Sequence, residues 1–164
     1  MRTFITGLLK GRKTRWGILA LIGAGLLLGT LLVQGGDTVP YRGKVVGQIT
    51  YLDNGGLMLQ ETGIGTHLGN FTVAGETDEN GILWFTITCA SEDELYGVVA
   101  GQSGNTVELL VFDGTGRFKG ASGNITATLT FDPQPVSYNP LVIGYTAIGT
   151  GTISTVGSST RVLP

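Results

Sequence analysis

The chain contains one histidine, which limits the chemistry that its side chains can perform. His67 alone cannot supply a multi-histidine metal site. A Ser-His-Asp triad would depend on the same residue, but no serine lies in a Gly-x-Ser-x-Gly elbow. We therefore interpret His67 as a hydrogen-bonded or surface residue at the start of a strand.

The chain also contains one cysteine, Cys89, so no disulfide can form within it. A lone cysteine in an apolar row is typical of a small buried hydrophobic residue, and the alternative is a reactive or intermolecular thiol.

Two acidic clusters are the remaining candidates for a binding site. Carboxylates at strand ends can bind calcium, but neither cluster has Asp-x-Asp-x-Asp-Gly spacing, so we interpret both as solvated turns. We predict no catalytic residue, no metal site and no cofactor. The clusters are Glu76, Asp78 and Glu79, and Glu92, Asp93 and Glu94.

A glycine-rich stretch lies between two strand-like segments. It has four glycines in ten positions, a composition typical of a tight turn with a bulge. We predict a structural turn in which Phe118 is buried as an anchor and Arg117 and Lys119 point outward. The glycines of this turn are Gly114, Gly116, Gly120 and Gly123.

The run Gly-Thr-Gly-Arg-Phe-Lys-Gly-Ala-Ser-Gly at 114–123, leading into a Thr-rich strand, resembles the dirigent and allene oxide cyclase families. A weaker similarity covers 65–72. The resemblance implies an eight-stranded antiparallel β-barrel, which surrounds an apolar pocket in the plant members. No residue of this chain matches the families' acidic and basic pocket residues at motif positions, so none is assigned their role.

The remaining pattern favours the same all-β fold. Short segments with strand composition alternate with Asn-Gly and Gly-Gly turns, and no amphipathic helix separates them. We predict an eight-stranded antiparallel β-barrel preceded by an N-terminal hydrophobic helix. Strands are expected near 41–51, 57–62, 67–75, 81–90, 94–101, 106–112, 124–132 and 144–154.

Two of these segments show which face is apolar. Around 82–89 and 124–131 apolar residues alternate with Trp or Thr, so one row faces inward and the Thr row faces water. The inward rows are apolar apart from Cys89. The residues predicted to line the barrel and to contact an apolar ligand are Leu83, Phe85, Ile87, Cys89, Ile125, Leu129 and Phe131.

Residues 17–33 carry no charge and include seven leucines, while five basic residues precede position 17. This pattern predicts export across the cytoplasmic membrane with the barrel outside, either secreted after signal-peptide cleavage or anchored by the uncleaved helix. The predicted parts are 1–36 for the signal or anchor, 37–156 for the barrel and 157–164 for a flexible tail.

After position 16 the chain has five basic and twelve acidic residues, a formal charge of −7, which argues against nucleic-acid binding. Two functions stay open. One is a non-enzymatic binding or structural module for an apolar small molecule or a protein partner. The other is an isomerase or cyclase acting inside the barrel, which would need an ionisable inward-facing group. The apolar inward rows favour the first. Formation of a homo-oligomer is left open.

Overall fold

A computed structural model describes residues 38–154, and most of them lie in β-strands. A single turn of 3-10 helix, η1 (Gly116–Phe118), lies between the sixth and seventh strands. The strands are β1 (Thr38–Tyr51), β2 (Leu57–Gly65), β3 (Gly69–Thr77), β4 (Leu83–Cys89), β5 (Glu94–Ser103), β6 (Thr106–Gly114), β7 (Gly123–Phe131), β8 (Ser137–Tyr138) and β9 (Leu141–Ser154).

The predicted hydrophobic helix and the predicted C-terminal tail lie outside the described residues. Within residues 38–154, no helix has the length and apolar character needed to cross a membrane.

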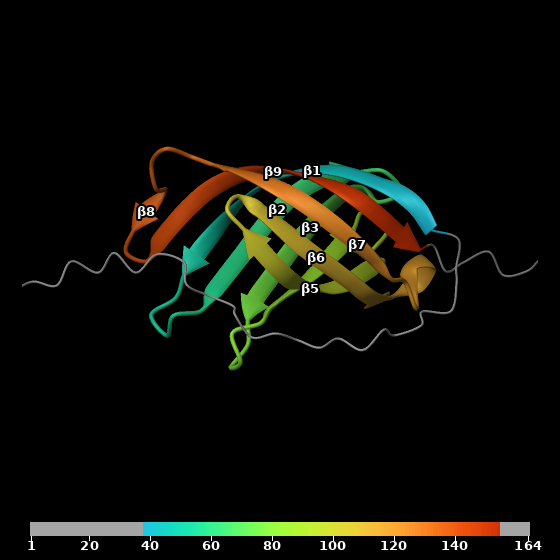
Figure 1. Ribbon diagram of the computed structural model, residues 1–164, viewed down its shortest axis with the longest axis horizontal. Helices are drawn as coiled ribbons and strands as arrows, with labels where there is room; N and C mark the ends of the chain where they lie inside the picture. The colour runs from blue at the N-terminus through green and yellow to red at the C-terminus, as the bar shows by residue number, and fades with distance from the viewer. Residues whose placement is uncertain (1–37, 155–164) are drawn as a thin grey trace, which may run out of the picture. The chain divides into compact units, whose positions relative to one another are not determined.

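The eight long strands form one antiparallel sheet in chain order, and β9 pairs with β1 to close it into a barrel (Figure 1). Gly43 of β1, for example, lies opposite Gly65 of β2 on one side and Gly149 of β9 on the other. Closure leaves no long strand with an unpaired edge. The predicted eight-stranded antiparallel barrel is confirmed, and the two-residue β8, which pairs with β9, adds to it.

The sequence predicted His67 at the start of a strand, but His67 lies in the turn before β3. Its φ of 65° is a left-handed backbone conformation, which strands do not use. The strand therefore begins two residues later, at Gly69.

Consecutive connections lie at opposite ends of the barrel, because every long strand is antiparallel to its neighbours. The end that carries η1 also receives the β2–β3 and β4–β5 turns, and we call it the η1 end. The other end carries β8 and the β1–β2, β3–β4 and β5–β6 turns, and we call it the β8 end. Figure 1 shows β8 and the helical turn at opposite ends.

The predicted glycine turn forms the cap of the η1 end. Gly116 and Gly120 have φ values of 53° and 71°, where a side chain would be strained. The Asp113 carboxylate brackets the turn by accepting hydrogen bonds from the Gly114 and Gly120 amides, at 2.8 and 2.9 Å. These bonds hold the pKa of Asp113 below its usual value. Phe118 is 2% exposed and plugs the interior.

Two contacts fasten this cap to the strands beside it. The Glu94 amide donates to Thr115 Oγ1 at 2.9 Å, and the Ser122 amide donates to Ser154 Oγ at 2.8 Å. A Cβ on Gly123 would collide with the backbone of Thr152 on β9, so the strand that leaves the turn lies unusually close to its neighbour.

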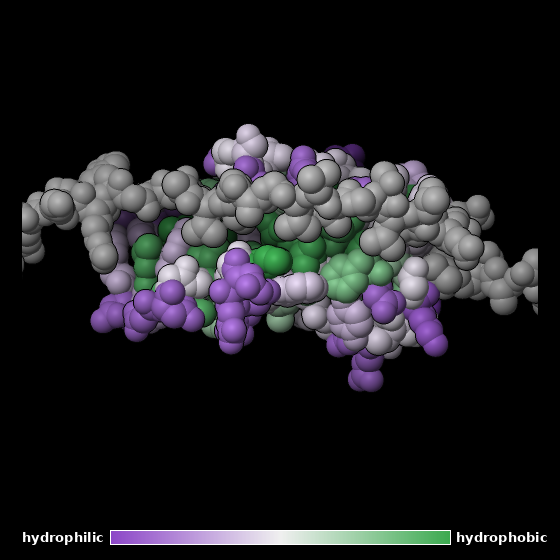
Figure 2. All heavy atoms as spheres, turned by 60° about the horizontal axis from the view of Figure 1, so that its bottom comes forward, coloured by the Kyte–Doolittle hydropathy of each residue, from purple (hydrophilic) through white to green (hydrophobic). Residues whose placement is uncertain are grey.

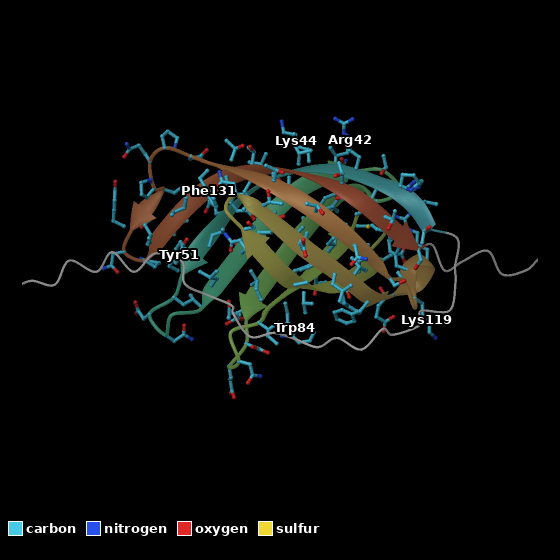
Figure 3. All side chains as sticks on the ribbon, in the orientation of Figure 1. Arg42, Lys44, Tyr51, Trp84, Lys119 and Phe131 are labelled. Carbon is cyan, nitrogen blue, oxygen red and sulfur yellow. The ribbon has the colours of Figure 1, made fainter. Side chains whose placement is uncertain are left out.

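Arg117 and Lys119 point outward, as expected, but Arg117 is not free of contacts. Its Nε lies 3.4 Å from Asp93 Oδ2, its Nη2 donates to the Leu68 carbonyl at 3.5 Å, and its guanidinium lies 4.6 Å from the centre of the Phe118 ring. Lys119 is exposed, and Figure 3 shows it at the η1 end.

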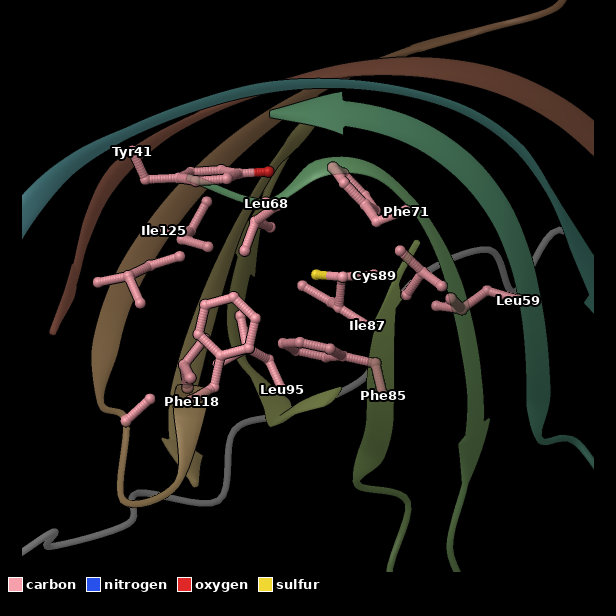
Figure 4. Close-up of a cluster of buried hydrophobic side chains, with 14 residues drawn as sticks. Tyr41, Leu59, Leu68, Phe71, Phe85, Ile87, Cys89, Leu95, Phe118 and Ile125 are labelled. Atoms are coloured by element: carbon pink, nitrogen blue, oxygen red, sulfur yellow. The ribbon is translucent and has the colours of Figure 1, made fainter. Parts of the chain in front are cut away.

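The core occupies the inside of the barrel, where an eight-stranded sheet leaves room for side chains. Aromatic and aliphatic residues from β1 to β5, η1 and β7 converge there (Figure 4). Outward positions on the same strands are polar or exposed; on β7 the Thr126, Thr128 and Thr130 row faces solvent, as predicted.

Candidate functional site

The functional candidate is a carboxylate inside the barrel. Glu61 lies on the inward row of β2, between the inward positions Leu59 and Gly63. It is opposite Gly47 of β1, and Gly47 is in turn opposite Tyr145 of β9. Three neighbouring strands therefore place an acid, a glycine and a phenol in one row across the inner wall.

The glycine in the middle of this row permits the acid and the phenol to meet. A Cβ on Gly47 would lie 2.6 Å from Glu61 Cγ and 2.6 Å from the Gln60 carbonyl oxygen. Without it, the Tyr145 hydroxyl reaches over β1 and donates a hydrogen bond to Glu61 Oε1. The pair therefore depends on the absence of a side chain at position 47.

One oxygen of this carboxylate is left for another donor. Within residues 38–154, no donor forms a hydrogen bond to Glu61 Oε2. Every side-chain oxygen or nitrogen of the partly buried and buried residues in this range that lacks a hydrogen bond keeps some contact with solvent. Glu61 is itself only partly buried. Glu61 Oε2 therefore keeps some contact with solvent.

The surroundings disfavour negative charge on this site. Burial raises the pKa of Glu61, and the hydrogen bond from Tyr145 offsets part of that rise. Burial and the neighbouring Glu61 charge also raise the pKa of Tyr145. The carboxyl group is thus poised to hold a proton or to receive a compensating positive charge.

Tyr41 supplies a second phenol to the interior. Its ring lies over the glycines of β1 and β2, because a Cβ on Gly43 would collide with Tyr41 Oη and one on Gly65 would lie 2.9 Å from Tyr41 Cε2. Burial, with a contribution from the Glu61 charge, raises the pKa of Tyr41 to about 12. Figure 4 shows the ring lying across the buried cluster.

The residues predicted to line the barrel divide by depth. Five of them are buried: Phe85, Ile87, Cys89, Ile125 and Leu129. Leu83 is partly buried and packs against them. Their role in binding a ligand stays a prediction.

Phe131 lies on the predicted inward row but is the most exposed of the seven residues. It is 37% exposed and lies toward the β8 end (Figure 3). Its ring centre lies 6.0 Å from that of Tyr145. Phe131 is the last residue of β7, which agrees with its exposure.

Inward-facing residues become more exposed from the η1 end to the β8 end. At the η1 end, Leu95, Val111, Phe118 and Ile153 are 0–2% exposed. At the β8 end, the inward positions on four strands are all partly exposed, so the interior is open to solvent there. These positions are Ile49, Leu83, Val107 and Ile143.

Cys89 lies in the sealed part and is 3% exposed, in keeping with the buried interpretation. Burial raises the pKa of its thiol, and the nearby Arg117 offsets part of that rise.

Carboxylates of the two acidic clusters stabilise turns between strands. Asp78 accepts hydrogen bonds from the Asn80 and Ile82 amides at 2.9 Å and from Trp84 Nε1 at 3.0 Å, which lower its pKa, the Trp84 bond most of all. Asp93 pairs with Arg117. These carboxylates hold the β3–β4 and β4–β5 turns in shape.

The outer surface offers a different feature, a depression of about 750 Å³ over β1–β4. It is lined mainly by outward-facing residues, among them Lys44, Val46, Thr62 and Ile64, and it is wide open to solvent. Hydrophobic side chains also reach the surface on the face shown in Figure 2. We place the candidate site inside the barrel, because the ionisable groups converge there.

The inward rows that the sequence assigned, on β4 and β7, are apolar apart from Cys89, but sequence reasoning missed the polar groups on other strands: Glu61, Tyr41 and Tyr145. The signal was present in 57–65, where Leu59, Glu61 and Gly63 alternate with Gln60 and Thr62. A glutamate between a leucine and a glycine on one face would have identified an inward acid.

No model of a known protein family matches the chain, and no curated protein matches it. Among solved structures, it is similar to that of the pterocarpan synthase dirigent protein GePTS1. The similarity covers 80% of this chain and 94% of the other, with 12% sequence identity and a TM-score of 0.46. The functional argument below uses this chain's own geometry.

Proposed function

We propose that the protein is a binding module that takes an apolar small molecule into the barrel through the β8 end. The observation that carries this proposal is the Glu61–Tyr145 pair, which keeps contact with solvent on a largely apolar inner wall. Few, well-placed polar groups in an apolar concavity are typical of small-molecule sites. The partly exposed residues Ile49, Leu83 and Val107 would contact the apolar part.

Binding of the neutral fluorescent probe N-phenyl-1-naphthylamine tests this. The wild-type protein should raise its fluorescence saturably. Val107→Trp, which fills the β8 half of the interior, should abolish the increase. Val46→Trp makes the same change on the outer face, where Val46 is 55% exposed, and should preserve it. No increase with the wild type, or equal binding by both folded variants, would overturn the proposal.

A second candidate is an isomerase or cyclase that moves a proton within the bound molecule. The specific observation in its favour is Glu61, since a carboxyl group with a raised pKa can act as a general acid or base near neutral pH. The two functions separate in Glu61→Gln: a binding module loses only affinity or selectivity, whereas an enzyme keeps binding and loses turnover of the bound molecule.

The proposed location is outside the cytoplasmic membrane, either secreted or anchored. The basic residues before position 17 and the uncharged run at 17–33 support it. A reporter that is active only after export, fused after Pro164, should be active. Activity confined to a cytoplasmic reporter would refute the orientation, and mass spectrometry of the mature chain would decide whether the segment is cleaved.

A further inference from the structure

The charges that face the interior are of one sign. The described part of the chain has four lysines and arginines, and none faces the inside of the barrel: Arg42 and Lys44 occupy outward positions on β1, and Arg117 and Lys119 lie on the outside of the η1 cap. Figure 3 shows Arg42 and Lys44 pointing away from the barrel. The inward-facing acid, Glu61, therefore meets no cation of this part of the chain.

Of the polar atoms that an entering ligand would meet, the oxygen Oε2 of ionised Glu61 can only accept a hydrogen bond, whereas the Tyr41 hydroxyl can donate or accept one. Tyr145 commits its hydroxyl proton to Glu61 Oε1, and Oε2 is open to solvent. Among the described residues no donor or acceptor is bonded to Tyr41 Oη, which also keeps contact with solvent. A ligand that ends in a carboxylate would place two acids together with no cation between them.

We propose that the ligand of this site is an apolar amine, whose protonated nitrogen donates to Glu61 Oε2 while its hydrocarbon part lies along Ile49, Leu83 and Val107. The inference rests on the proposed binding function and names its ligand class. An ammonium group supplies the positive charge that the interior lacks, and a charge-assisted hydrogen bond in a partly desolvated site is stronger than a neutral one. The direction of the Glu61 pKa is consistent with an acid that lacks a partner cation.

Isothermal titration with three probes of equal chain length tests the class: n-octylamine, 1-octanol and sodium octanoate, each below its aggregation concentration, at pH 7. The amine should bind about tenfold or more tightly than the alcohol, since a hydrogen bond to a charged group is worth more than a neutral one. Octanoate should bind most weakly. Ethylamine, which has the charge without the chain, should not bind measurably.

Two isosteric variants locate the selectivity. Glu61→Gln should bring the affinity for octylamine down to that for octanol. Glu108→Gln removes an exposed acid from the outer side of β6 and should leave all three affinities unchanged, which controls for the net acidity of the barrel.

The outcomes distinguish this inference from the function beneath it. If none of the three probes binds, the binding function itself is overturned. If octanol or octanoate binds as tightly as octylamine, the interior binds apolar molecules but the amine class is wrong. If octylamine binds Glu61→Gln as tightly as the wild type, the ammonium is held elsewhere and the inference fails.

Discussion

The η1 half and the β8 half of the barrel are built from the same eight strands but differ in what fills them. In the η1 half, a turn between strands folds inward and Phe118 completes a core that excludes water. In the β8 half, the strands end without an equivalent plug, and inward-facing residues such as Val107 stay partly exposed. The sealed half provides stability, and the open half is where we propose that a ligand binds.

The carboxylate lies midway along the barrel wall. Glu61 lies in the middle of β2, between Leu59, which belongs to the buried cluster, and Gly63. Its hydroxyl partner Tyr145 belongs to the smaller cluster with Leu129 and Ala147, toward the β8 end. A partly buried acid on the inner wall of a barrel is a feature that stability alone does not require.

The largest expected effect concerns the plug. Phe118→Ala should lower the free energy of unfolding by about 3–5 kcal/mol, the usual cost of removing a fully buried aromatic ring. Phe131→Ala makes the same change at the open end, where the ring is 37% exposed, and should cost about 1 kcal/mol. Urea denaturation measures both. Equal costs would remove the distinction between the ends.

The next effect concerns the glycine between the acid and the phenol. Gly47→Ala should destabilise the protein by about 1–3 kcal/mol, because its Cβ would overlap Glu61 Cγ and the Gln60 carbonyl. Gly101→Ala is the matched control, since its Cβ would have Glu108 Oε2 at 3.5 Å as its nearest neighbour. A change within about 0.5 kcal/mol is expected there. Thermal unfolding of the two variants would show the difference, and a tolerant Gly47 would mean that Glu61 lies elsewhere.

A smaller effect should appear in the pH dependence of stability. The ordinary pKa of this group is 4.5, and burial raises it in the folded protein. Between the two values the folded state holds more protons than the unfolded state, so the free energy of unfolding falls as pH rises through that window. The free energy of unfolding of Glu61→Gln should not show this fall. The difference between the variant and the wild type should therefore change in favour of the variant as pH rises from 4. Parallel curves for the two proteins would contradict a raised pKa.

The smallest effects belong to the outside of the η1 cap. Arg117→Ala should cost about 1 kcal/mol or less, because the pair with Asp93 is exposed to water. Lys119→Ala should stay within about 0.5 kcal/mol. A large loss in either variant, measured by chemical denaturation, would show that the outer side of the cap matters as much as Phe118.

These two halves also show how far the sequence could be interpreted. The barrel and the faces of β4 and β7 were predictable, because strict alternation and glycine turns carry local information. The exposure of Phe131 was not, because it depends on where neighbouring strands end. The Glu61–Tyr145 pair was also hidden, since its residues are 84 positions apart and meet only when β9 closes on β1.

The contrast between a sealed and an open half is tested most directly by thiol reactivity inside the barrel. The native Cys89 reports on the η1 half, and Val107→Cys in a Cys89→Ala background reports on the β8 half. Each is treated with methyl methanethiosulfonate under native conditions, and each rate is divided by that of the unfolded protein to remove intrinsic differences between the thiols. The account predicts that the thiol at position 107 reacts at least about tenfold faster than Cys89, as its partial exposure requires. Equal protection of the two thiols would contradict it.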